Sequence, residues 1–143
     1  MRYTREQMAR IRSEVIRCGL DVGKSFLALP LDTLREICNG VGADDSPRWV
    51  RDILTWIYRE YQASAAIHDC DYFAGSDAED GRLTADRRFR NNCLLEWADC
   101  FGTMRWLRPR ALWDRNKIRL AYNALRLFGE SAWRAAKQDG GND

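Results

Sequence analysis

The stretch AAIHDCDYFAG, residues 65–75, contains the only histidine of the 143-residue chain and lies in the segment that decides the fold. Residues 48–73 contain no glycine or proline. Within them, five residues recur at spacings of three and four: Ile57, Tyr61, Ala65, His68 and Tyr72. This period predicts a helical segment, in one or two pieces, with His68 on its inward face.

A second helix is predicted to follow the loop AGSDAEDGR, residues 74–82, and to begin near Thr84, a good N-cap residue. Its inward face is counted as Asp86, Phe89, Cys93, Trp97 and Cys100. A buried carboxylate costs free energy unless it is paired or hydrogen-bonded. Two antiparallel helices would bring Asp86 beside His68, so we expect these two side chains to form a pair.

The other segments are also predicted to be helical. Thr4 and Gln7 form a capping-box pattern before a helix that ends near Cys18, and a short helix follows Pro30. A final helix is expected from about Arg110. Because no convincing alternation of period two occurs, we predict an all-α fold: one domain over residues 1–137 and a flexible tail at 138–143.

The composition is typical of a soluble globular domain, with 45% hydrophobic and 31% charged residues. The net charge of +2 gives no strong field for nucleic acid. Charges interrupt the apolar positions of the first residues, and no later run is long enough to span a bilayer, so we expect a cytoplasmic location. Five cysteines without a C-x-x-C pair indicate neither a zinc site nor a disulfide framework.

Two interpretations of the His68–Asp86 pair stay open at this point. Such a pair on apolar helix faces is often only a packing element. In the catalytic interpretation, Asp86 fixes the imidazole tautomer and leaves the other ring nitrogen free to accept a proton. Asp69 points to a neighbouring sector of the helix, where it could bind a hard cation together with backbone carbonyls of the glycine-containing loop at 38–42.

Three motifs carry a resemblance to a known family. HDCDY (68–72) resembles the phospholipase A2 signature of His-Asp, two residues and Tyr; ADRRF (85–89) resembles the Asp-Arg segment of its second long helix; and CNGVG (38–42) resembles its calcium loop. The series is still more similar to a group of uncharacterised phage and prophage proteins, over roughly residues 34–133. Asp71 and Ala85 stand where secreted phospholipases have disulfide cysteines, which agrees with a reducing compartment.

The resemblance implies a phospholipase A2-like core of two antiparallel helices carrying the His/Asp pair, with additional N- and C-terminal helices. In it His68 is the base that activates a water, Asp86 holds the imidazole, and Tyr72 bonds to Asp86. A calcium ion is held by Asp69 and by carbonyls of three loop residues: Cys38, Gly40 and Gly42. The implied reaction is hydrolysis of the sn-2 ester of a glycerophospholipid.

A contact with a phospholipid membrane surface is also predicted. One face of the helical segment that begins at residue 48 carries Trp49, Ile53, Trp56 and Ile57, with Arg48 and Arg51 beside them. This is the pattern of an amphipathic interfacial patch, although the tryptophans could instead fill the core. Trp106, Trp113 and Trp133 are interpreted as packing residues.

The alternative function keeps the fold without turnover. In it the chain is a phage accessory protein that binds and inhibits a host defence protein or sequesters a small phosphorylated ligand, since a fold does not determine a function. Nucleic-acid binding through the arginines of residues 105–119 is the least favoured interpretation, because it leaves His68, Asp69 and Asp86 unexplained.

Overall fold

The computed structural model describes residues 3–23, 25–38, 46–75 and 79–140. Within these ranges the chain is helical and contains no strand, so the all-α prediction is confirmed. Its elements in chain order are α1 (Arg5–Arg17), α2 (Leu31–Ile37), α3 (Arg48–Glu60), α4 (Gln62–Ala74), α5 (Glu79–Phe101), the 3-10 turn η1 (Arg105–Leu107), α6 (Pro109–Phe128) and α7 (Glu130–Gly140). None of the helices described here is long and apolar enough to cross a membrane.

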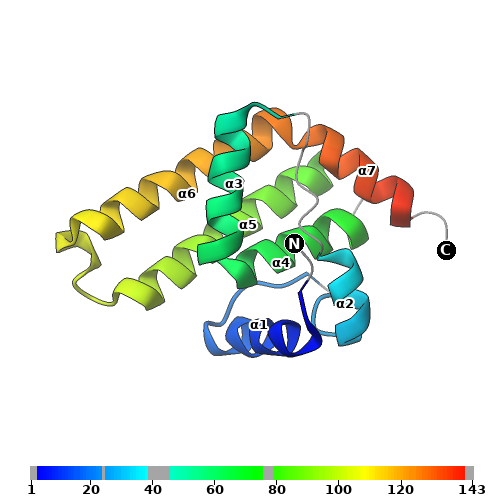
Figure 1. Cartoon of the computed structure of the whole chain (residues 1–143), viewed down its shortest axis with the longest axis horizontal. Helices are drawn as coiled ribbons and strands as arrows, with labels where there is room; N and C mark the ends of the chain where they lie inside the picture. Colours follow the sequence, from blue (N-terminus) through cyan, green and yellow to red (C-terminus); the bar gives the residue numbers. More distant parts are fainter. Residues whose placement is uncertain (1–2, 24, 39–45, 76–78, 141–143) are drawn as a thin grey trace.

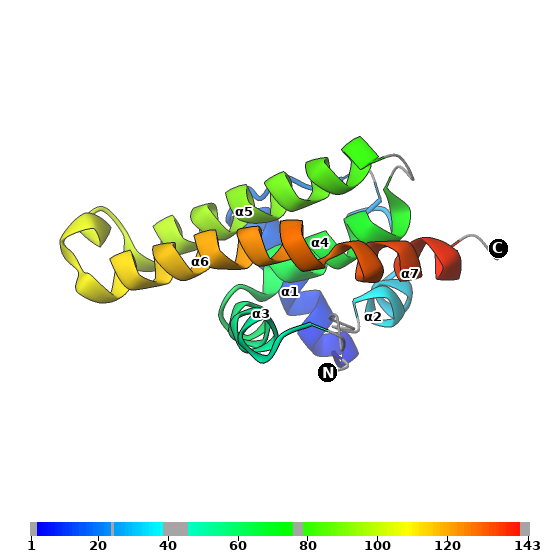
Figure 2. The ribbon, with the colours of Figure 1, turned by 90° about the horizontal axis from the view of Figure 1, so that it is seen from above.

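The helix α4 lies at the centre of the molecule (Figure 1). It packs against α5, α3, α1, α2 and α7, while α5 and α6 form a long hairpin. Figure 2 shows α5 and α3 on opposite sides of α4 and α6, with α7 continuing beyond the end of α6. The site helix is therefore enclosed by neighbours along most of its length.

Three apolar clusters of the described residues meet at α4. The first joins α3, α5 and α6 and includes Ala65 of α4, and the second joins α1 and α2 to Ala66, Ile67 and Cys70 of α4. The third is smaller and joins Tyr72 of α4 to α5 and α7. A helix buried on most of its sides reads as apolar around its circumference, which is why only a few positions of α4 are polar. His68 and Tyr72 are among its buried residues.

Several predicted boundaries are confirmed. Thr4 caps α1 with the complete capping box to Gln7, and α2 follows Pro30 directly. The segment 48–73 forms two helices that are separated at Tyr61, whose backbone (φ −126°, ψ 55°) leaves the helical region without a glycine or proline.

Other predictions were wrong. α5 begins at Glu79 and not near Thr84, because the Thr84 hydroxyl donates to the Asp80 carbonyl inside the helix instead of capping it. Cys100 was counted on the inward face but is exposed, because the next residue, Phe101, is the one that packs against the core there. α7 runs to Gly140 and so includes the first residues of the segment expected as a flexible tail, whose flexibility stays a prediction.

Candidate active site

The structure brings His68 and Asp86 together between α4 and α5. His68 Nε2 lies 2.9 Å from Asp86 Oδ1, and both side chains are buried. The Tyr72 hydroxyl donates to the same oxygen at 2.8 Å, and Arg126 Nη1 of α6 donates to Asp86 Oδ2 at 2.7 Å. Three side chains from two helices thus converge on one buried carboxylate.

The charge state of this carboxylate follows from its donors. Burial alone would raise the pKa of Asp86, but the hydrogen bonds from His68, Arg126 and Tyr72 outweigh burial and hold its pKa below the ordinary value. Burial and the nearby Asp86 charge raise the pKa of Tyr72, so its hydroxyl stays protonated and donates. An ionised Asp86 therefore faces His68 at neutral pH.

The imidazole is held in one orientation. Its ring packs at 4.1 Å between centroids on Tyr72 and at 5.0 Å on Phe89. With Nε2–H donated to Asp86, a neutral ring carries its lone pair on Nδ1, and no described residue makes a hydrogen bond to Nδ1. This is the arrangement of a histidine that can act as a general base.

An apolar pocket opens beside His68 between α3, α4, α5, α6 and α7. Most of its lining is apolar: Val50, Leu54, Ile57, Phe89, Ala124, Leu125, Phe128 and Ala132. The polar side chains on its wall are few and include His68, Asp69 and Tyr72. Its volume of about 40 Å³ admits only a small group next to the imidazole.

Asp69 lies on the wall of this pocket, where it accepts a hydrogen bond from the Tyr58 hydroxyl of α3. Burial and the adjacent Asp69 charge raise the pKa of Tyr58 well above its usual value, so the phenol remains a donor. Of the other predicted calcium ligands, Cys38 is buried with its thiol bonded to the Ala66 carbonyl. Gly40 and Gly42 lie outside the described residues.

The described residues alone do not form a calcium site. Calcium requires six to eight oxygen ligands. Of the predicted ligands that the structure describes, only Asp69 has a carboxylate, and it accepts a hydrogen bond from Tyr58.

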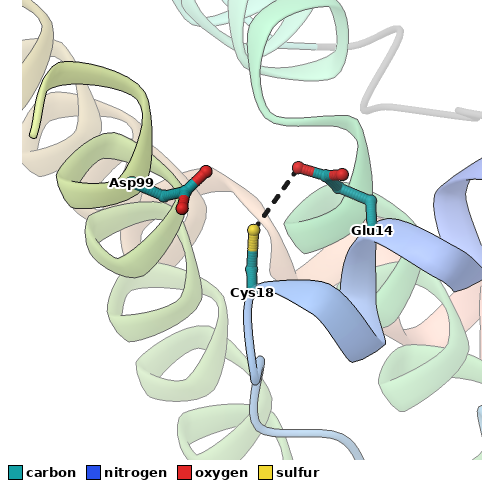
Figure 3. A group of neighbouring side chains, drawn as sticks. All are labelled: Glu14, Cys18 and Asp99. Atoms are coloured by element: carbon teal, nitrogen blue, oxygen red, sulfur yellow. Dashed lines mark hydrogen bonds between the residues drawn. The ribbon is translucent and has the colours of Figure 1, made fainter.

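Another group with the ligand types of a metal site lies elsewhere. Glu14, Cys18 and Asp99 have ligand atoms within 4.8 Å of one another (Figure 3). However, the Arg17 guanidinium forms ion pairs with both carboxylates, and burial raises the pKa of the Cys18 thiol to about 12. The group is best explained as an arginine-centred ion pair that joins α1 to α5.

Tyr58 and Arg126 are the site residues that sequence reasoning missed. Tyr58 lies eleven residues before its partner and in a different helix, so no local spacing connects the two. Arg126 lies forty residues after Asp86 in a chain rich in arginine. Only its position next to the buried Leu125 on α6 gives a weak signal that it faces inward.

A partly buried ion pair connects two charged side chains close to the site. Asp71 Oδ2 of α4 lies 2.7 Å from Arg88 Nη1 of α5, and Arg88 Nε also reaches Asp21 at 3.2 Å. A Cβ atom on Gly23 would lie 2.5 Å from Asp71 Oδ1, so the 20–23 segment packs closely over this pair. The pair links α4 to α5 near the site without a covalent bond.

The residues predicted to meet a membrane do not lie in one environment. Trp56 is half-buried and packs edge-on against Tyr61, whereas Trp49 is 51% exposed and meets Phe128 edge-on. Arg48 and Arg51 are exposed. Of the three tryptophans interpreted as packing residues, Trp133 is buried, and Trp106 is 51% exposed but packs edge-on against Trp97. Trp113 is exposed to 63%, so the interpretation was wrong for Trp113.

The chain matches no protein-family model, and no curated protein or solved structure is significantly similar to it. The geometry of the site is therefore the basis on which a function can be assigned.

Proposed function

We propose that the chain is a lipid esterase of the phospholipase A2 type, with His68 as the general base. One observation carries this proposal: the imidazole is held at Nε2 by a buried, ionised Asp86, while the ring borders an apolar pocket. The resemblance of the HDCDY and ADRRF motifs supports the same assignment of roles.

In the proposed reaction the carbonyl end of the substrate's acyl chain reaches the apolar pocket, and a water bonds to His68 Nδ1. The water attacks the ester carbonyl and its proton moves to Nδ1, so an imidazolium forms beside Asp86. The tetrahedral intermediate then collapses, and Nδ1 returns the proton to the leaving alcohol oxygen. The products are a fatty acid and a lysophospholipid.

Tyr72 and Arg126 act through Asp86 in this scheme and are positioning residues. Their hydrogen bonds keep the carboxylate ionised and fixed, so that it stabilises the imidazolium when it forms. If calcium binds at Asp69, it supplies positive charge near the ester oxygens. No step above requires it.

The test measures fatty-acid release from vesicles whose phospholipid carries a labelled sn-2 chain. We expect release by the wild-type chain and a loss of about 10²- to 10⁴-fold for His68→Ala and His68→Gln. The exposed Asn91→Ala serves as the control and should retain full release. No release by the wild-type chain, or equal release by His68→Gln, would refute the proposal and leave the non-enzymatic accessory role.

Calcium is tested separately by isothermal calorimetry and by release in the presence of a chelator. The resemblance implies that the wild-type chain takes up calcium, that Asp69→Asn does not, and that the chelator stops release. Release that continues in the chelator would keep His68 as the base and remove calcium from the proposal.

A further inference from the structure

The outer side of α6 carries large apolar side chains that no part of the described fold covers. Leu112, Trp113, Leu120 and Leu127 are all exposed, and Trp113 and Leu127 are exposed to 63% and 73%. We call these four residues the α6 outer face. Figure 2, which looks onto α6, shows no helix lying over it.

These residues are not scattered. Trp113, Leu120 and Leu127 are spaced by seven residues. Because seven residues are nearly two full helical turns, each of these side chains is rotated by only about 20° from the previous one around the helix axis. At the N-terminal end of α6 the turn that includes η1 adds Met104, Trp106 and Leu107, the last of which is 74% exposed. The apolar surface therefore runs along a helix of 20 residues and continues onto the hairpin end, which protrudes past the other helices in Figures 1 and 2.

The chain segment that carries this surface is basic. Residues 102–129 contain seven basic residues and one acid, a formal charge of +6 in a chain whose total is +2. The single acid, Asp114, is buried, whereas Arg108, Arg110, Arg115 and Arg119 are exposed. The remainder of the chain consequently carries −4, so the basic charge is concentrated beside the apolar residues.

We infer that the α6 outer face and the adjoining hairpin turn form the surface by which the chain binds an anionic phospholipid bilayer. An apolar line of Leu and Trp flanked by arginines is what lets a helix lie in the interface of such a bilayer. Trp106 and Trp113 have the amphipathic ring that favours this depth.

Other occupants explain less of the surface. Nucleic acid would use the arginines but would leave the exposed leucines in contact with nothing apolar. A second copy docked face to face would bring two segments of charge +6 together, which opposes association. An anionic bilayer offers acyl chains for the leucines to contact and negative headgroups for the arginines to bind.

The inference rests on the proposed function for a substrate that lies in a bilayer, but its test needs no turnover. The full chain is mixed with vesicles of phosphatidylcholine alone or with about 30% phosphatidylglycerol, and binding is measured by flotation. We expect binding to the anionic vesicles that weakens as salt is added.

The apolar contribution is tested with Leu120→Ser/Leu127→Ser. The matched control is Ile16→Ser/Leu95→Ser, because these residues are exposed apolar side chains on α1 and α5. The outer-face variant should raise the apparent Kd for anionic vesicles by at least about tenfold, and the control by less than about twofold. Equal effects of the two variants would overturn the inference.

The basic contribution is tested with Arg115→Gln/Arg119→Gln against Arg10→Gln/Arg59→Gln, which are exposed arginines elsewhere. Each arginine removed from the α6 side should weaken binding about fivefold.

Three outcomes contradict the inference: no binding of the wild-type chain to anionic vesicles, binding to a short DNA or RNA that the leucine variant leaves unchanged, or a dimer in sedimentation equilibrium that the leucine variant abolishes.

The two proposals fail separately. His68→Ala should bind anionic vesicles as tightly as the wild-type chain. Binding without fatty-acid release would refute only the esterase, and release from detergent-dispersed substrate without vesicle binding would refute only the membrane surface.

Discussion

Both oxygens of the Asp86 carboxylate are used: Oδ1 accepts from His68 and Tyr72, and Oδ2 accepts from Arg126. A carboxylate with this many donors keeps its charge and its position even when fully buried. The imidazole can then hold only one tautomer. At the scale of single residues, the chemistry of the site depends on these donors.

Removing one donor should have a measurable cost. Tyr72→Phe keeps the ring but leaves Oδ1 one hydrogen bond short, so we expect a loss of about 1–2 kcal/mol in the free energy of unfolding. Fatty-acid release should fall less than in His68→Ala, because the base remains. The control is Tyr122→Phe, which also removes a hydroxyl but keeps the ring on which Arg90 stacks. Its free energy of unfolding in urea should change by less than about 0.5 kcal/mol. Equal losses in both variants would argue against a special role of the Tyr72 hydroxyl.

The depressed pKa of Asp86 also makes a prediction about pH. A group whose pKa is lower in the folded state contributes stability above its unfolded pKa, and this contribution is lost as the pH falls through the folded pKa. Below about pH 4 the wild-type chain should therefore lose stability more steeply than Asp86→Asn, although the variant is less stable at pH 7. Parallel curves between pH 5 and pH 3 would show that Asp86 is not the group concerned.

Sequence reasoning reached His68, Asp86 and Tyr72 because each lies on a periodic inward face, where a polar residue is conspicuous. It did not reach Tyr58 or Arg126, since their contacts depend on how α3 and α6 are placed over α4 and α5. Periodicity indicates which face of a helix is inward, but not which neighbouring helix that face meets.

At the scale of elements, α4 begins without a cap of its own. Tyr61 makes no side-chain capping bond, and the Glu96 carboxylate of α5 accepts from the Ser64 backbone N–H at 3.0 Å and from the Ser64 hydroxyl. A residue of the next helix thus satisfies one of the donors at the start of α4. This explains how the 48–73 segment can break at Tyr61 without a local signal in the sequence.

The Glu96 cap is testable with a pair of substitutions. Glu96→Ala should cost about 1–2 kcal/mol of stability because it leaves a donor of α4 unsatisfied. Burial raises the pKa of Glu96, so the neutral Glu96→Gln, which keeps an oxygen acceptor, should cost much less. Because the folded-state pKa is raised, the wild-type chain loses folding stability as the pH rises through that pKa and Glu96 ionises. The stability of Glu96→Gln does not change in this way, so the variant should become more stable relative to the wild type at higher pH. Urea unfolding at pH 4 and pH 8 checks both expectations.

At the scale of the whole molecule, the pocket exists only because five helices meet around His68. The sequence predicted the helices and their inward faces but not this meeting, because it requires the crossing of α3 over α6 and the turn between α6 and α7. The same holds for the α6 outer face: the spacing of its leucines is visible in the sequence, but whether another helix covers them is not.

The turn between α6 and α7 is the place where the global fold controls the site, and Gly129 is its key residue. A Cβ atom at Gly129 would lie 2.5 Å from the Leu125 carbonyl oxygen and 3.0 Å from the Tyr72 hydroxyl. Gly129→Val should therefore displace either the turn or Tyr72, and with it the hydrogen bond to Asp86. We expect a loss of stability of about 1–3 kcal/mol and a fall in fatty-acid release that exceeds the loss of folded protein.

A matched control separates the site effect from general destabilisation. Gly19 has a φ of 61° and nothing within 4 Å of its Cβ position, so Gly19→Ala strains the backbone without touching Tyr72. It should lower stability by about 1 kcal/mol and leave release per folded molecule unchanged. If Gly129→Val reduces release only in proportion to its folded fraction, as Gly19→Ala does, then the α6–α7 turn holds the fold but does not position Tyr72.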